Sequence, residues 1–141
     1  MQKRNTAREE IQKVKELEEE GVPAKGLRVI GIKKTFHKWP FGILSEKDVK
    51  ANKGIYFDAA EAELLCILGH NGAGKSTLIN ILTGVLSPSY GSAKITNQDI
   101  TEDMEQIRLQ MGVVPQFDIL WDNLTASEHI RLYAQLKGIP E

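Results

Sequence analysis

One continuous stretch of this sequence constrains the fold more than any other, because it joins an apolar run, a glycine-rich loop and an amphipathic segment. The apolar run is "ELLCILG", near residues 63 to 69, and it predicts a central strand buried on both faces. The loop is "GHNGAGKST", residues 69 to 77. Apolar residues then recur at helical spacing until "SPSYG" stops the pattern, which predicts a helix over residues 75 to 86.

The loop has the composition of a phosphate cradle. Gly69 and Gly74 enclose four residues and precede Lys75 and Ser76, which matches the pattern G-x-x-x-x-G-K-[ST]. Glycines let successive backbone N–H groups turn toward phosphate oxygens, and the following helix adds its positive N-terminus. We therefore expect Lys75 to contact the β- and γ-phosphates, Ser76 to bind Mg²⁺ and Thr77 to donate to the α-phosphate. The alternative is a strand-to-helix turn that binds nothing.

Further strands are predicted on both sides of this unit. They are expected at "LRVIGI" (27 to 32), "GIYF" (54 to 57), "SAKIT" (92 to 96) and "MGVVPQ" (111 to 116). Between the first two lies "KKTFHKWPFGILSEKDVKANKG", which we interpret as a polar insertion with an aromatic cluster. The strand at 111 to 116 should end facing the glycine loop.

Three more helices are predicted. Residues 6 to 20 form a charged segment with a Thr6–Glu9 capping box and a thin apolar stripe, so we expect a marginal, solvated helix. A second helix is expected around residues 103 to 110. A third follows the Thr125–Glu128 capping box, and its apolar face is expected at Ile130, Tyr133 and Ala134.

Composition excludes several classes of function. The chain has 18 basic and 19 acidic residues and a net charge of −1, so it lacks the basic field of a nucleic-acid-binding protein. Cys66 is a lone cysteine, expected to act as a small hydrophobe, and His37, His70 and His129 are too far apart for a zinc site. No secretory signal or run of about 18 apolar residues is present, so we expect any membrane association to come through a partner.

The residues around the loop narrow the choice among P-loop proteins. "LGHNGAGKSTLINILTGVLSPSYGSAKI" and "MGVVPQFDILWDNLTASEHI" resemble the first half of an ATP-binding cassette (ABC) nucleotide-binding domain. Within that family the sequence is most similar to the A subfamily of transporters, which move lipids and sterols. The resemblance covers residues 27 to 141, and residues 1 to 26 look like the linker that precedes such a domain.

The resemblance implies ATP and Mg²⁺ as cofactors, with catalytic roles for Lys75 and Gln116. Gln116 corresponds to the Q-loop glutamine, which with Ser76 would contact the metal. Phe36 falls where the family places a ring that stacks on adenine, although Trp39 or Phe41 could take this role, or Phe36 could be a core residue. The Walker A loop corresponds to Gly69, His70, Asn71, Gly72, Ala73, Gly74, Lys75, Ser76 and Thr77.

Two departures from a complete, unstrained domain are visible. Ala62 stands where the family usually has glycine, so a positive φ there would be strained. Hydrolysis needs an acidic residue at the end of a second buried strand, and no such strand follows Gln116; Asp58, after "GIYF", is interpreted as a surface turn residue. The resemblance places the signature, Walker B, D-loop and switch histidine beyond Glu141.

These inferences combine into an expected fold and domain organisation. The fold is an α/β P-loop NTPase core with a mixed sheet, an ABC-type nucleotide-binding domain truncated before the signature and Walker B motifs. Residues 1 to 26 form a charged linker helix, and residues 27 to 141 form the N-terminal part of the domain.

The expected function is to bind Mg-ATP as part of an ABC transporter ATPase that powers lipid transport at the cytoplasmic face of a membrane. The resemblance implies two partners: transmembrane domains, docked through residues 117 to 125, and a second nucleotide-binding domain in a head-to-tail ATP sandwich. Trp121 lies in the docking segment and would be either an interface or a core residue. Two alternatives remain: a truncated nucleotide-binding or interaction module without turnover, and a soluble P-loop kinase or GTPase.

Overall fold

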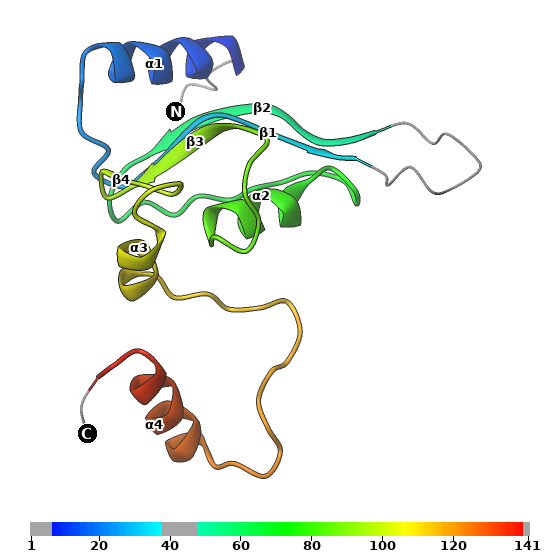
Figure 1. Ribbon diagram of the computed structural model, residues 1–141, viewed down its shortest axis with the longest axis vertical. Helices are drawn as coiled ribbons and strands as arrows, with labels where there is room; N and C mark the ends of the chain where they lie inside the picture. Colours follow the sequence, from blue (N-terminus) through cyan, green and yellow to red (C-terminus); the bar gives the residue numbers. More distant parts are fainter. Residues whose placement is uncertain (1–6, 38–47, 140–141) are drawn as a thin grey trace.

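An antiparallel sheet with the strand order β2-β1-β3-β4 organises the fold (Figure 1). The computed structural model describes residues 7–37 and 48–139. The strands are β1 (Leu27–Phe36), β2 (Val49–Ala59), β3 (Tyr90–Ile95) and β4 (Gln98–Asp99). The helices are α1 (Ala7–Glu19), α2 (Lys75–Leu82), α3 (Met104–Gln110) and α4 (Ala126–Leu136). The α/β class is confirmed, but the described sheet is antiparallel rather than mixed.

The first two strands form a long antiparallel ladder, longer than the sequence predicts. It runs from Leu27 paired with Ala59 to Phe36 paired with Val49. Backbone pairing extends both strands through polar residues that carry no strand pattern of their own, so much of the predicted polar insertion belongs to β1 and β2. Trp39 and Phe41 lie outside the described residues.

The core lies between this sheet and the helices α2 and α3. Val29 and Ile32 of β1 both point into it, although residues an odd number apart in a regular strand face opposite sides. Gly31, with φ 65°, lies at a register shift between Ile30 and Ile32 that restores the phase. The other core residues are Leu78, Ile81, Leu82, Ala93, Ile100 and Ile107.

Helix α1 packs on the opposite face of the sheet instead of standing apart as a solvated linker (Figure 1). Its Val14 is fully buried, and Glu18 pairs with Arg28 at 2.9 Å and Lys94 at 2.5 Å. The predicted helix is therefore confirmed, but its expected isolation is wrong, because a narrow apolar stripe is supplemented by ion pairs to the strands. Thr6, of the predicted capping box, lies outside the described residues.

Helix α2 is shorter than predicted. It ends at Leu82, and Gly84 follows in a left-handed conformation with φ 73°. The backbone carbonyl of Asn80 accepts hydrogen bonds from the N–H groups of Val85 and Leu86. These bonds turn the chain away from the helix axis and leave Val85 exposed. The predicted helix around 103 to 110 is confirmed as α3.

The two predicted buried strands, 63 to 69 and 111 to 116, are not strands in the structure. Leu64 and Leu68 are each 90% exposed and Val114 is 95% exposed. A strand buried on both faces needs hydrogen-bonding neighbours, and no described strand pairs with either segment. Cys66 is exposed for the same reason, contrary to its expected burial.

Helix α4 begins at the predicted capping box, since the Thr125 and Glu128 side chains each bond the other's backbone N–H. Its apolar face is wrong, however: the residue it buries is His129, while Ile130 is exposed. Lys137 donates to the carbonyls of Arg108 and Met111, which joins the end of α4 to the end of α3. None of the described helices is long and apolar enough to cross a bilayer.

Candidate nucleotide-binding site

The glycine loop leaves the extended segment at Gly69 and enters α2 at Lys75. Gly72 and Gly74 have φ of 81° and 88°, a left-handed conformation that side chains disfavour. The Ala73 N–H bonds the His70 carbonyl at 3.2 Å and closes the turn. These two glycines therefore supply backbone conformations that a residue with a side chain would adopt only under strain.

Lys75 folds back over its own loop. Its Nζ donates to the carbonyl oxygens of Gly69 at 2.7 Å and His70 at 2.9 Å. Both bonds are to neutral acceptors, whereas a phosphate offers negatively charged oxygens, which attract the ammonium more strongly. The ammonium is thus already held at the loop. Exchange of its two carbonyl partners for phosphate oxygens would be energetically favourable.

An open cavity of about 480 Å³ joins the loop to residues far away in the sequence. Phe36, at the end of β1, lines it together with Gln116, which follows α3. The loop contributes Asn71, Gly72, Ala73, Gly74, Lys75, Ser76 and Thr77 to the same cavity. Of the predicted site residues, only Gly69 and His70 do not line it; both instead hold Lys75.

Phe36 stands at the cavity with its ring partly exposed. The Lys34 Nζ lies 5.3 Å from the centroid of the ring, within the range of a cation–π contact. Because the ring belongs to no core cluster and faces the loop cavity, the core interpretation of Phe36 is not supported.

The cavity contains no carboxylate among the described residues that line it. Asp58 lies within β2 rather than in a surface turn, and its Oδ1 accepts a 2.8 Å bond from Arg28 Nε. Within the described ranges, no group of three His, Cys, Asp or Glu side chains could hold a metal ion. The side-chain oxygens that line the cavity belong to Asn71, Ser76, Thr77 and Gln116.

The segment after Gln116 is apolar and only partly packed. Phe117, Ile119, Leu120 and Trp121 are all exposed. The Trp121 ring stacks on His129 with a centroid distance of 6.2 Å, and its backbone N–H donates to His129 Nε2 at 2.9 Å. Trp121 therefore contacts α4 on one side and solvent on the other.

Sequence reasoning missed the part of the cavity contributed by β2. Val49, Lys50 and Ala51 line it, although no local motif marks them. They reach the loop because β2 pairs with β1, so only the strand register reveals them. The next residue, Asn52, bonds the loop directly.

A glycine loop of the pattern G-x-x-x-x-G-K-[ST] that leads into a helix is typical of a P-loop domain of the α/β class. The sequence model of the family described as "ABC transporter" matches residues 52–139. The chain therefore belongs to this family.

Similar proteins and solved structures are consistent with this family assignment. The chain is 48% identical to "ABC transporter A family member 8" of Dictyostelium discoideum over 78% of this chain, and 41% identical to human "Phospholipid-transporting ATPase ABCA3" over 81%. It spans 13% and 6% of those proteins. A solved dimeric, post-hydrolysis ATP-binding cassette with ADP and phosphate matches at TM-score 0.65 and 28% identity, over 79% of this chain and 47% of that chain. The predicted resemblance to the A subfamily is confirmed.

Proposed function

We propose that this chain binds Mg-ATP in the loop cavity, as part of an ABC transporter ATPase that powers lipid transport across a membrane. The observation that carries the proposal is the cavity that the glycine loop, Phe36 and Gln116 share. The lipid substrate is inferred from the A-subfamily relatives, one of which is named a phospholipid-transporting ATPase. Membership of the ABC transporter family sets aside a soluble kinase or GTPase.

Different residues of the cavity contact different parts of the ATP molecule. Adenine stacks on Phe36, and the phosphates lie against the loop, where Lys75 exchanges its two carbonyl partners for β- and γ-phosphate oxygens. Thr77, in the first turn of α2, donates to the α-phosphate. The positive N-terminus of the helix favours the same negative groups.

Mg²⁺ fits the donors that line this cavity. A magnesium ion prefers oxygen ligands, keeps several waters and commonly binds through one or two protein groups plus substrate phosphates. The Ser76 hydroxyl and the Gln116 amide oxygen would supply the protein ligands, both from the cavity lining. When bound, the ion neutralises charge on the phosphates.

Turnover requires more than these residues provide. No carboxylate lines the described cavity, so the carboxylate that hydrolysis needs beside Gln116 is not supplied there. Residues 1 to 141 would therefore bind nucleotide without hydrolysing it. In the complete transporter, we propose that a second nucleotide-binding domain closes over the ATP, as the dimeric form of the solved cassette suggests.

The exposed segment 117 to 125 is the proposed docking surface for the transmembrane domains. Its apolar side chains lie immediately after Gln116, so a shift of Gln116 on binding or losing the γ-phosphate would move the surface. We propose that docking through this segment holds the chain at the cytoplasmic face of the membrane.

A titration of Mg-ATP into the 141-residue chain tests the nucleotide site. Lys75→Ala removes charge-assisted bonds of about 1.5–3 kcal/mol, which corresponds to roughly ten- to a hundredfold weaker binding. Phe36→Ala should weaken the binding of ATP but leave the binding of inorganic tripolyphosphate unchanged, because only ATP carries a base that can stack on the ring. Phosphate release should stay at background in all of these proteins.

Lys53→Ala is the matched control for the loss of one positive charge, because Lys53 is exposed on β2 and outside the cavity lining. It should bind Mg-ATP as the wild type does, and thermal unfolding should show that every variant is folded. Equal affinity of the wild type and a folded Lys75→Ala variant would contradict the proposed site. Phosphate release that Lys75→Ala abolishes would contradict the absence of turnover.

A further inference from the structure

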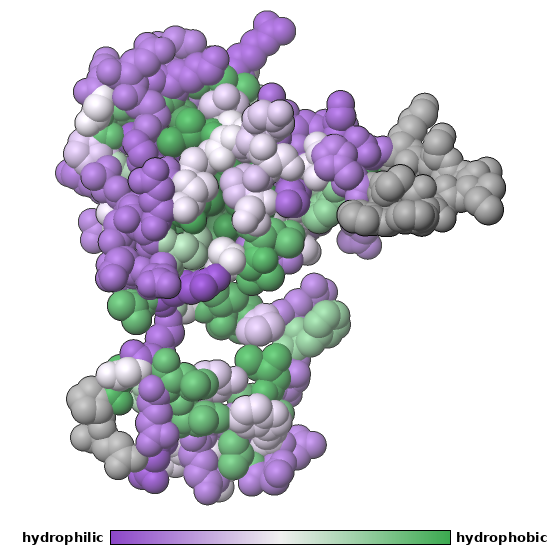
Figure 2. Space-filling model, viewed as in Figure 1, coloured by the Kyte–Doolittle hydropathy of each residue, from purple (hydrophilic) through white to green (hydrophobic). Residues whose placement is uncertain are grey.

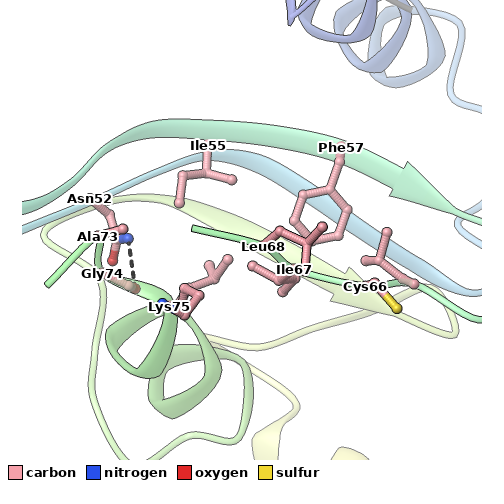
Figure 3. Close-up of a pocket in the computed structure, with 11 residues that line it drawn as sticks. Asn52, Ile55, Phe57, Cys66, Ile67, Leu68, Ala73, Gly74 and Lys75 are labelled. Atoms are coloured by element: carbon pink, nitrogen blue, oxygen red, sulfur yellow. Dashed lines mark hydrogen bonds between the residues drawn. The ribbon is translucent and has the colours of Figure 1, made fainter. Parts of the chain in front are cut away.

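A buried amide side chain connects β2 to the end of the glycine loop. Asn52 is only 3% exposed, and its Nδ2 donates to the Gly74 carbonyl at 3.2 Å, the dashed line in Figure 3. The sequence does not mark Asn52, because it lies 22 residues before Gly74 and outside the loop pattern. Its neighbour Ala51 lines the nucleotide cavity.

Gly74 is the joint at which the loop becomes a helix. Its φ is 88°, and its carbonyl also accepts the Leu78 N–H at 2.9 Å, the first helical bond of α2. A Cβ on Gly74 would lie 2.4 Å from the Ala51 carbonyl oxygen, so the loop passes directly against the β2 backbone. The Gly74 carbonyl is thus held from two sides, by the helix and by the strand.

The same side chain also lowers the stability of the fold. Asn52 Oδ1 is buried and has no hydrogen-bond partner among the described residues. Its surroundings are apolar: in Figure 3, Ile55 and Phe57 of β2 lie with Ile67 and Leu68 around one pocket that Asn52 also lines. A buried acceptor without a partner is destabilising, and an apolar side chain of similar shape can be neutral or stabilising in its place.

We propose that Asn52 is a positioning residue of the nucleotide site. By holding the Gly74 carbonyl against β2, it fixes the peptide plane at the loop–helix joint and aims the N–H groups of Lys75 and Ser76 at the phosphates. The inference rests on the proposed function. Its distinctive consequence is a separation of two quantities: nucleotide affinity depends on Asn52, whereas the stability of the fold does not.

The test is Asn52→Leu in the 141-residue chain. Mg-ATP affinity should fall by roughly three- to tenfold, the effect of one lost neutral hydrogen bond. The thermal unfolding midpoint should stay unchanged or rise, because the partnerless oxygen is removed. Without nucleotide, amide hydrogen exchange should speed up at residues 74 to 78 and not in the paired strands.

Two further variants separate the possible failures. Asn80→Leu makes the same substitution on α2, away from the cavity lining, and should leave affinity unchanged. Lys75→Ala tests the site itself: if it binds as the wild type does, the proposed function is wrong. If Lys75→Ala weakens binding and Asn52→Leu does not, Asn52 has no positioning role. If Asn52→Leu does not fold, Asn52→Ala is measured, and failure of both to fold would show that Asn52 supports the fold and overturn the proposal.

Discussion

Ala62 adopts a left-handed backbone conformation, with φ 58°, in the turn between β2 and the extended segment. This is the strained position anticipated from the alanine that stands where the family usually has glycine. The left-handed conformation costs a residue with a side chain about 1–2 kcal/mol. The Glu63 side chain, which accepts the Ala60 N–H at 2.8 Å, holds the turn in place despite this cost.

Ala62→Gly should therefore raise the unfolding free energy by up to about 1 kcal/mol, since relief of the strain is partly offset by the greater freedom of glycine in the unfolded chain. Urea unfolding followed by circular dichroism measures the change. Ala60→Gly is the matched control: Ala60 is exposed in the same region and has no positive φ, so that substitution should destabilise the protein. If both variants lose stability, Ala62 is not strained.

At the scale of the element, α1 is held to the sheet by a charge network around Arg28. This guanidinium is buried and donates to Glu18 at 2.9 Å and to Asp58 at 2.8 Å. Burial acts to raise the pKa of Glu18, but hydrogen bonds from Lys94 and Arg28, and then their charges, lower it below the ordinary 4.5. The stabilisation from Glu18 is therefore complete above pH 4.5 and is lost as the pH falls through its lower folded pKa.

Glu18→Gln should lower the unfolding free energy at neutral pH by about 1.5–3 kcal/mol, the range for hydrogen bonds to charged groups. It should also flatten the loss of stability in acid, because one carboxylate that must be protonated has been removed. Urea unfolding at a series of pH values measures both effects. Glu19→Gln, one residue further along and exposed, should change neither; identical curves for the two variants would mean that the network does not hold α1.

At the scale of the whole molecule, the described structure has two apolar surfaces of different character. One is the extended segment before the glycine loop, where Leu64 is 90% exposed and Leu65, Ile67 and Leu68 line a pocket with β2. The other follows Gln116 and leads to α4, which in Figure 1 stands apart from the sheet. Hydrophobic surface is visible over both parts in Figure 2. Exposed apolar surface of this kind marks sites that other parts of a protein or its partners cover.

Trp121→Ala tests the second surface in the full-length transporter. Nucleotide affinity should stay close to that of the wild type, because Trp121 does not line the cavity, while transport and substrate-stimulated ATPase should fall together. The exposed Tyr90, on β3, offers a control, and Tyr90→Ala should leave both activities intact. Loss of nucleotide binding and thermal stability in the Trp121 variant would make Trp121 a core residue and contradict docking.

The sequence by itself determined the local features of this protein. Glycines at 72 and 74 permit the left-handed conformation that the loop adopts, the pair Thr125 and Glu128 caps its own helix, and Ala62 carries its strain within one residue. Each of these depends on contacts between residues close in the chain, so a pattern of neighbours suffices to predict it. The P-loop and its family could be predicted from the sequence for the same reason.

Tertiary structure alone decided what depends on pairing between distant segments. The apolar run at 63 to 69 has the composition of a buried strand, but composition supplies no hydrogen-bonding neighbour, and the run remains extended and exposed. Conversely, the polar first part of β2, residues 49 to 53, becomes a strand because β1 pairs with it, and that register brings Asn52 to Gly74. Backbone hydrogen bonds between strands are made by groups that every residue carries, so side-chain patterns alone could not reveal which segments would meet.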